Sequence, residues 1–220
     1  MVEHEHAHEE RAADREAVGQ AVDERVLVDH AARVVHAIGA DRPVLVDSAG
    51  CGAALKAYGE LLATPEARAF ASQVSDVHEW LAADPRLAAL QETMGGGGPG
   101  SGDTVIVQDP CHLRHAQGCH EAVRDVLAPH ISLVELDDEG LCCGAGGAYS
   151  VVQPALAAAV RERKVAAVAR AANRSGATTV VSANPGCAMY LAAAGLDVRH
   201  PMEVLAHVLG VDGTIEEGVD

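Results

Sequence analysis

The strongest constraint in this sequence is the regular alternation of short apolar segments with longer helical ones. Each apolar segment is rich in Val, Leu or Ile and is followed by a stretch in which apolar residues recur at helical spacing. Strands that alternate with helices favour a parallel sheet with helical crossovers, so we expect a doubly wound α/β fold. The expected strands cover residues 43–47, 104–108, 131–136 and 178–182, and the expected helices cover 21–39, 53–62, 65–83, 119–127, 154–173, 187–194 and 201–209.

A glycine-rich segment divides the chain into two parts. Residues 94–102 (MGGGGPGSG) contain no residue that we assign to a core, which is typical of a linker. We therefore expect a first, partial structural unit at 21–93 and a second unit at 103–210. A polar N-terminal tail at 1–20 and an acidic C-terminal tail at 211–220 would flank them.

Two segments of the chain resemble each other. Residues 44–59 (VLVDSAGCGAALKAYG) and 180–195 (VVSANPGCAMYLAAAG) both place Gly-Cys between an expected strand and an expected helix. The cysteines in question, Cys51 and Cys187, are 136 residues apart. We interpret the two segments as the same part of two pseudo-repeated units. The first unit is incomplete, because no cysteine pair stands at the corresponding distance before Cys51.

Composition excludes several classes of protein. The net charge is −16 and Lys56 and Lys164 are the only lysines, which argues against a nucleic-acid partner. No apolar run of about 18 residues is present, so we expect no membrane span. Residues 1–20 lack the hydrophobic core of a signal peptide. Six cysteines in such a chain indicate metal binding or thiol chemistry rather than a disulfide scaffold, and we expect a cytoplasmic protein that meets a membrane only through a complex.

Four cysteines follow three of the expected strands. Cys111 lies in Asp-Pro-Cys-His after the second strand, Cys142 and Cys143 lie in Leu-Cys-Cys-Gly after the third, and Cys187 lies in Asn-Pro-Gly-Cys after the fourth. Loops that leave the carboxyl ends of parallel strands converge on one edge of the sheet. We therefore expect these four thiols to meet in space.

The residue types around these thiols indicate which group they bind. Thiolate ligands select soft metals, among which iron–sulfur clusters and zinc are the main candidates. Zinc sites commonly use a Cys-x2–4-Cys chelate, a spacing that does not occur in this sequence. Gly144 and Gly186 would let a bulky inorganic core approach the backbone. An iron–sulfur cluster is the favoured interpretation, and zinc, a redox-active dithiol and buried structural cysteines remain the alternatives.

The order DPCH, LCCGAGG and NPGC, preceded by SAGCGAALKAYG and followed by HPMEVLAHVL, resembles the cysteine-rich CCG proteins. The similarity extends from about residue 21 to residue 209. It is to the C-terminal half of glycolate oxidase iron–sulfur subunits and to lactate utilisation protein A, and more distantly to the cysteine-rich subunit of heterodisulfide reductases. Full-length members begin with a ferredoxin-like segment of Cys-x2-Cys-x2-Cys runs, and this sequence contains none.

The resemblance implies that Cys111, Cys142, Cys143 and Cys187 hold an iron–sulfur cluster, expected to be [4Fe–4S] of cubane or non-cubane type. Cys51 matches the last cysteine of the first repeat and is a further candidate. The implied function is electron transfer in a flavin-dependent glycolate or lactate oxidase, without catalytic residues in this chain. The implied partners are the flavin subunit and a ferredoxin-like subunit or segment. Two alternatives remain, namely a heterodisulfide-reductase-like thiol/disulfide reductase subunit and a non-catalytic assembly subunit stabilised by a metal.

Other residues are expected to support the ligands. Asp109 would form an Asx-type turn that fixes the following loop. His112 would either hydrogen-bond to cluster sulfur or lie at the surface. Cys119 stands outside every motif and is expected to be a small, partly exposed thiol. The residues that we expect around the cluster are Asp109, His112, Gly144 and Gly186.

Overall fold

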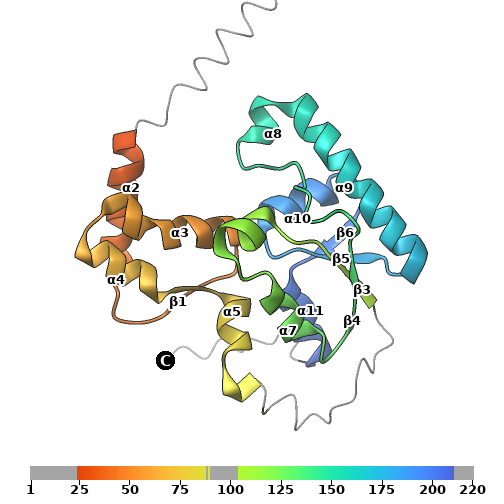
Figure 1. Ribbon diagram of the computed structural model, residues 1–220, viewed down its shortest axis with the longest axis horizontal. Coiled ribbons are helices and arrows are strands. Elements are labelled where there is room, and N and C mark those ends of the chain that lie inside the picture. The colour runs from red at the N-terminus through yellow and green to blue at the C-terminus, as the bar shows by residue number, and fades with distance from the viewer. Residues whose placement is uncertain (1–23, 88, 90–103, 211–220) are drawn as a thin grey trace, which may run out of the picture.

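The computed structural model describes residues 24–87, 89 and 104–210 (Figure 1). Its main sheet consists of parallel strands in the order β4-β3-β5-β6. β3 is central, and its Val105 lies opposite Leu133 on one side and Thr179 on the other. The expected parallel α/β fold with helical crossovers is therefore confirmed. The strands are β3 (Thr104–Val107), β4 (Ser132–Glu135), β5 (Thr179–Val181) and β6 (Asp197–Arg199).

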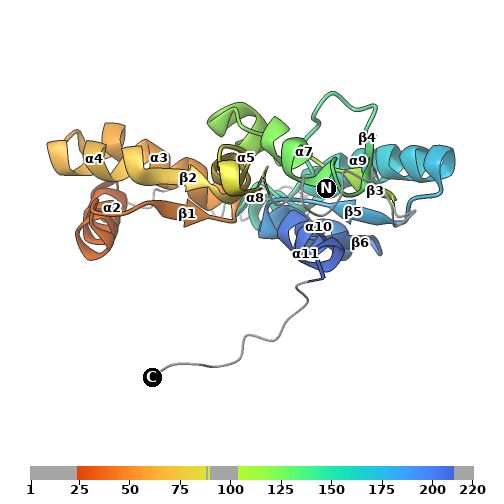
Figure 2. The ribbon, with the colours of Figure 1, turned by 90° about the horizontal axis from the view of Figure 1, so that it is seen from below.

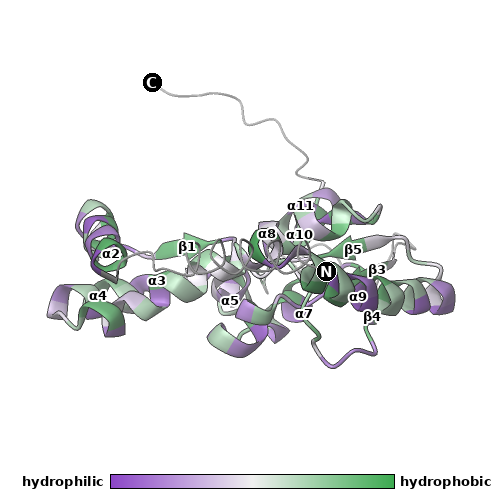
Figure 3. Ribbon diagram, turned by 90° about the horizontal axis from the view of Figure 1, so that it is seen from above, coloured by the Kyte–Doolittle hydropathy of each residue, from purple (hydrophilic) through white to green (hydrophobic). Residues whose placement is uncertain are grey.

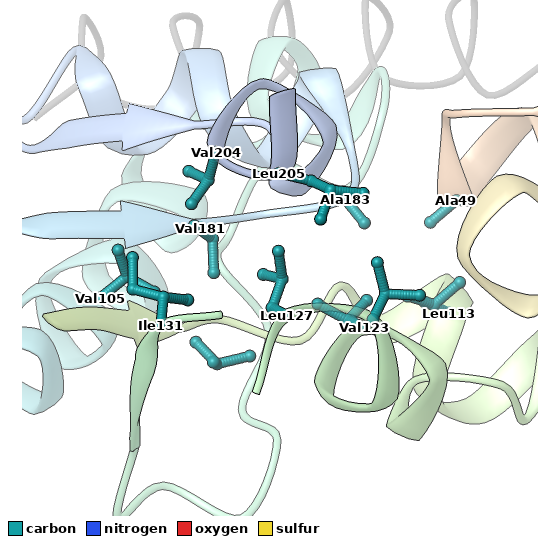
Figure 4. Packing of buried hydrophobic residues seen from close by; sticks show 12 residues of the cluster. Ala49, Val105, Leu113, Val123, Leu127, Ile131, Val181, Ala183, Val204 and Leu205 are labelled. Atoms are coloured by element: carbon teal, nitrogen blue, oxygen red, sulfur yellow. The ribbon is translucent and has the colours of Figure 1, made fainter. Parts of the chain in front are cut away.

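Helices cover both faces of this sheet. They are the π-helix η1 (His112–Gln117), α7 (Glu121–Leu127), α8 (Tyr149–Val152), α9 (Pro154–Ser175), α10 (Pro185–Ala192) and α11 (Pro201–Val208). Leu127 of α7 and Leu205 of α11 pack on one face of the sheet (Figure 4). Val168 of α9 packs against Ile106 on the other face. Short strands thus gain stability from apolar layers on both sides.

The long helix α9 begins and ends close to where its sequence predicts. Pro154 occupies its first turn, where the missing N–H has no partner to lose. Gly176 follows its end with φ +77°, a left-handed conformation that favours glycine. The helix connects β4 to β5 and also contacts α8 and α10, so it lies against the segments that leave both strands.

A second, two-stranded parallel sheet lies in the N-terminal part of the described chain. There β1 (Val44–Val46) pairs with β2 (Val74–Asp76), surrounded by α2 (Glu24–Ile38), α3 (Ala49–Leu62), α4 (Pro65–Gln73) and α5 (Val77–Ala82). Phe70 and Val35 form the centre of a small separate core. Figure 2 shows this part as one end of an elongated molecule, with α5 between it and the main sheet. Ala49, at the start of α3, extends into the core of the main sheet (Figure 4).

The chain between residues 65 and 83 differs from the expectation. The sequence predicted one helical stretch, but the structure contains α4, then β2, then α5. The prediction was wrong because a three-residue strand is too short to interrupt a helical pattern visibly. Asp76 ends β2 and caps α5, since its carboxylate accepts the N–H of His78 over 2.9 Å. β6, η1 and α8 are equally short elements that the pattern did not predict.

Hydropathy follows this arrangement. In Figure 3, β1 and β5 are hydrophobic, whereas the helices carry hydrophobic and hydrophilic residues side by side. None of the described helices is long and apolar enough to cross a membrane. The predicted linker at 94–102 and the predicted tails at 1–20 and 211–220 lie outside the described residues, and the division into two units stays a prediction.

Candidate metal centre

Loops from three strands meet at the carboxyl edge of the main sheet. β4, β3 and β5 are adjacent and parallel, so their carboxyl ends lie side by side. The loops and helix starts that follow these ends carry the cysteines singled out in the sequence, namely Cys111, Cys142, Cys143 and Cys187. The topology gathers these residues at one place, as the sequence led us to expect.

A buried polar bridge fixes the spacing of two of these loops. The hydroxyl of Ser182 donates to Oε1 of Gln108 over 2.7 Å, and Nε2 of Gln108 donates to the carbonyl of Asp109 over 2.6 Å. Ser182 and Gln108 are both buried, so their polar atoms require partners inside the protein. Sequence reasoning missed this bridge, because it joins two residues that are 74 positions apart and belong to no motif.

The thiols form a contiguous group. Sγ of Cys143 lies 3.0 Å from Sγ of Cys187. The backbone N–H of Gly144 donates to Sγ of Cys142 over 3.3 Å, so the turn after the vicinal pair directs a donor at sulfur. Cys111 is near enough to Cys142 for the two thiols to affect each other's ionisation. Three loops therefore deliver four sulfur atoms to one pocket.

This pocket is apolar on its inner side. Cys143 is 2% exposed and Cys187 is 4% exposed, and both belong to a buried cluster with Ala145 and Leu191. Cys111 and Cys142 are partly exposed. A group held here would be shielded from water by the core and still lie near the protein surface, which is the arrangement that electron transfer requires.

The metal-free thiols are mostly held neutral. Burial raises the pKa of Cys111, and Cys142 raises it further. The hydrogen bond with Cys143 raises the pKa of Cys142, as does burial. The hydrogen bond with Cys142 lowers the pKa of Cys143, but the contact with Cys187 and burial outweigh it and raise the pKa to about 11. The hydrogen bond from Cys143 lowers the pKa of Cys187, so Cys187 is the first of the four to ionise.

Gly144 allows the loop of the vicinal pair to lie directly against α9. Its φ is +93°, and a Cβ atom there would lie 2.5 Å from the carbonyl oxygen of Ala157 and 3.0 Å from the nitrogen of Arg161. Arg161 in turn donates from Nη1 to the carbonyl of Tyr190 over 3.3 Å, and its guanidinium lies 4.5 Å from the centre of the Tyr190 ring. α9 therefore supports both the loop of the pair and α10, which carries Cys187.

Asp109 supports the Cys111 loop differently from the expectation. Its carboxylate accepts hydrogen bonds from Arg124 over 2.9 and 3.1 Å and from Arg114 over 2.9 Å. The predicted Asx-type turn was wrong, because two arginines from the following helices take up the carboxylate. Arg114 lies in η1 and Arg124 in α7, so the ion pairs hold the loop against both helices.

Asn184 connects the thiol group to the N-terminal part of the molecule. Its Nδ2 donates to Sγ of Cys187 over 3.4 Å, and its Oδ1 accepts the N–H of Gly50 over 3.0 Å. Cys51 follows Gly50 in the first turn of α3 and is exposed. Among the described residues, Cys51 forms no hydrogen bond with another cysteine, so it adjoins the site only through its neighbour.

The remaining predicted residues lie around this group or away from it. His112 is exposed, and its Nδ1 lies 3.7 Å from Sγ of Cys111. Gly186 precedes Cys187 in the first turn of α10. Cys119 packs half-buried against the core of the main sheet, and burial raises its pKa to about 11. Cys119 is therefore the partly exposed thiol that the sequence suggested.

The donor set fits a multi-iron core. In residues 24–87, 89 and 104–210, no three His, Cys, Asp or Glu side chains are arranged around a single metal ion. Cys142 and Cys143 instead offer two adjacent sulfur atoms, which can reach different atoms of one inorganic core. Neutral thiols must lose their protons on binding, and iron supplies the positive charge that makes their loss favourable.

Comparison with known proteins places this site in a family. The family model of the cysteine-rich domain, named CCG, matches residues 105–192, a range that includes all four gathered thiols. The chain is a CCG cysteine-rich domain protein. Within this family it is related to glycolate oxidase iron–sulfur subunits and to heterodisulfide reductase subunits.

Three relatives illustrate the range of the family. The chain is 33% identical over 177 residues to the glycolate oxidase iron-sulfur subunit of Escherichia coli, an alignment that covers 76% of this chain and 40% of the relative. It is 30% identical over 155 residues to the probable glycolate oxidase iron-sulfur subunit of Bacillus subtilis, which covers 67% and 33%. It is 33% identical over 119 residues to one subunit of the dihydromethanophenazine:CoB--CoM heterodisulfide reductase of Methanosarcina barkeri, which covers 49% and 28%. The chain thus spans well under half of the length of these relatives.

Proposed function

We propose that this protein is an electron-transfer subunit that holds one iron–sulfur cluster on the thiolates of Cys111, Cys142, Cys143 and Cys187. The observation that carries the proposal is the convergence of four thiols from three loops in one apolar pocket. When bound, an iron–sulfur cluster supplies a site that accepts and releases single electrons. We assign it to the [4Fe–4S] class, cubane or non-cubane.

The residues of the chain would tune such a group through hydrogen bonds and burial. Gly144 N–H already donates to Sγ of Cys142, and Nδ2 of Asn184 donates to Sγ of Cys187. Donors directed at ligand sulfur stabilise the more negatively charged, reduced form and raise its potential. The side chains of Leu191 and Tyr190 exclude water from the inner side. His112, near Sγ of Cys111, would complete the surroundings on the exposed side.

The partner that we propose is the flavin subunit of a 2-hydroxy-acid oxidase that acts on glycolate or lactate, with a ferredoxin-like subunit or segment as a second electron carrier. Support comes from the two glycolate oxidase iron-sulfur subunits to which the chain is related. The four thiols serve as ligands in this proposal, and the oxidation of the hydroxy acid is assigned to the flavin of the partner.

The N-terminal part is proposed to be an incomplete copy of the second unit, with a boundary between residues 93 and 103. Cys51 is the third residue of α3 and Cys187 is the third residue of α10, and each helix follows a strand of a parallel sheet. The strands β2 and β6 are each followed by a helix that starts with a capping box. In this interpretation Cys51 is the last ligand position of a copy without its other ligands.

A second candidate function is a thiol/disulfide reductase subunit. The direct contact between the thiols of Cys143 and Cys187 and the relationship to the Methanosarcina barkeri heterodisulfide reductase favour it. A third candidate, a non-catalytic assembly subunit, would use the same thiols for a structural metal.

An anaerobic redox experiment separates these functions. The chain is reconstituted with iron and sulfide, reduced with dithionite, and then mixed with oxidised flavin mononucleotide or with an excess of a small organic disulfide. Electron transfer predicts that flavin reoxidises the cluster and that the disulfide leaves its EPR spectrum unchanged. A disulfide-dependent spectrum would support the reductase instead. Zinc alone in the purified chain would support the assembly subunit, and Cys119→Ser is the matched control for nonspecific thiol loss.

A further inference from the structure

Lys164 is fully buried in the middle of α9. Its exposed fraction is 0%, and its Nζ forms an ion pair with Oδ2 of Asp138, whose side chain is also buried. Neither Nζ nor this Oδ2 has another hydrogen-bonding partner in the described part of the chain. A lysine is almost never fully buried unless its charge has a partner, so the pair occupies a position that tolerates neither charge alone.

Asp138 shapes the turn that leads into the vicinal cysteines. Its Oδ1 accepts the N–H of Gly140 over 3.2 Å, and its carbonyl accepts the N–H of Leu141 over 3.0 Å. Glu139 and Gly140 both have positive φ, +51° and +80°. A non-glycine residue in this conformation requires support from its surroundings, because the left-handed region is sterically unfavourable. Cys142 follows Leu141 directly, so the direction of this turn sets the position of the pair.

A neighbouring ion pair shows by contrast what is special about Lys164. Arg170 lies on the same helix and pairs with Asp137, but both side chains are about half exposed. Exposed pairs of this kind contribute little to stability or position, because water screens them. Lys164 and Asp138 instead meet in a dry environment, where the loss of one partner leaves an uncompensated charge.

We propose that Lys164 is a positioning residue for the Cys142–Cys143 pair. It ties the 138–141 turn to α9, and thereby holds the thiol of Cys143 against that of Cys187. The inference deepens the proposed function, because correct placement of these thiols is what cluster binding requires. It concerns the metal-free chain as well, so its test does not depend on iron.

The test measures how readily the two thiols meet in the reduced, metal-free, full-length chain. Diamide removes two electrons and two protons from Cys143 and Cys187 to form one disulfide, and is itself reduced to the hydrazine. Mass spectrometry of the linked peptides gives the rate. We expect Lys164→Met to slow this disulfide on the order of tenfold, the effect of about 1.4 kcal/mol against the close approach. Arg170→Gln on the same helix is the matched control and should keep the wild-type rate.

The double variant Asp138→Asn/Lys164→Met separates position from overall stability. Asn keeps an acceptor for Gly140 N–H, and no buried charge remains, so cooperative unfolding near the wild-type midpoint is expected. The proposal predicts that this folded variant still forms the disulfide slowly. A wild-type rate in the double variant, an equal slowing in Arg170→Gln, or loss of cooperative unfolding in the double variant would each overturn it.

The same variants distinguish this inference from the proposed function. If the wild-type chain takes up no iron while Lys164→Met slows the disulfide, the proposed function fails and the positioning role stands. If the wild-type chain binds iron and sulfide while all disulfide rates are equal, the positioning role fails and the proposed function stands.

Discussion

Substitution of Gly144 by alanine tests how tightly the cysteine loop lies against α9. Two separable penalties are expected. Alanine at φ +93° is strained by about 1–3 kcal/mol. Its Cβ would also lie 2.5 Å from the carbonyl oxygen of Ala157, a backbone atom that can move away only if the loop or the helix shifts, which adds about 1–3 kcal/mol. Gly144→Ala should therefore lower the free energy of unfolding by about 2–6 kcal/mol.

Gly147 provides the matched control in the same loop. Its φ is +60°, and a Cβ atom there would have no neighbour within 4 Å. Gly147→Ala should therefore cost only the conformational penalty of about 1–2 kcal/mol. The difference between the two variants, about 1–3 kcal/mol, isolates the contact with α9.

The assay is urea unfolding of the reduced, metal-free chain under anaerobic conditions, followed by iron analysis after reconstitution. We expect Gly144→Ala to lose both stability and iron, and Gly147→Ala to retain most of both. Equal unfolding free energies for the two variants would refute the reasoning, because the contact with α9 would then contribute nothing.

Three other perturbations probe the surroundings of the site. Asp109→Ala leaves two arginines without their shared carboxylate, so urea unfolding should show a loss of about 2–4 kcal/mol. Asn184→Ala removes the acceptor of Gly50 N–H and the donor to Cys187, so we expect a loss of about 1–3 kcal/mol in unfolding and a lower cluster potential in a redox titration. Burial lowers the pKa of His200, so the unfolded chain binds this proton more readily, and stability should fall as the pH drops below about 6.5. His200→Asn keeps a helix cap but cannot titrate, and should flatten that fall by at most about 1.4 kcal/mol per pH unit.

Each of these has an outcome that contradicts it. An Asp109→Ala chain as stable as the wild type would mean that the arginines find other partners. An unchanged potential in Asn184→Ala would remove its amide from the tuning of the site. A pH profile of unfolding that is identical in His200→Asn and in the wild type would show that another group titrates there.

The main sheet could be predicted because its signals are local and repeated. Each strand of β3, β4 and β5 lies within an apolar segment bounded by turn residues, and the Pro and Gly that flank α9 mark its ends. The parallel order then follows from the alternation with helices. The gathering of the four thiols was predictable for the same reason, since it requires only that loops from the carboxyl ends of neighbouring strands converge.

The support of the site could not be predicted, because it consists of contacts between residues distant in sequence. Gln108 with Ser182, Lys164 with Asp138 and Asn184 with Gly50 belong to no motif and have no spacing that announces them. Their signal in the sequence is weak. Lys164 is one of two lysines and lies among alanines and valines, which could have marked it as a buried charge.

Short elements were missed for another physical reason. β2 and β6 have three residues each, so they show no alternation that distinguishes a strand from the end of a helix. Both strands sit at the edge of their sheets, where pairing with one neighbour suffices. The predicted helix at 65–83 therefore ran through β2.

Iron and acid-labile sulfide per chain, measured after anaerobic purification of three proteins, test the central claim most directly. The account predicts iron and sulfide in the wild type and in Cys119→Ser, whose altered thiol lies outside the pocket, and their loss in Cys187→Ser. Retention of the full iron and sulfide content by Cys187→Ser, or zinc without sulfide in the wild type, would contradict it.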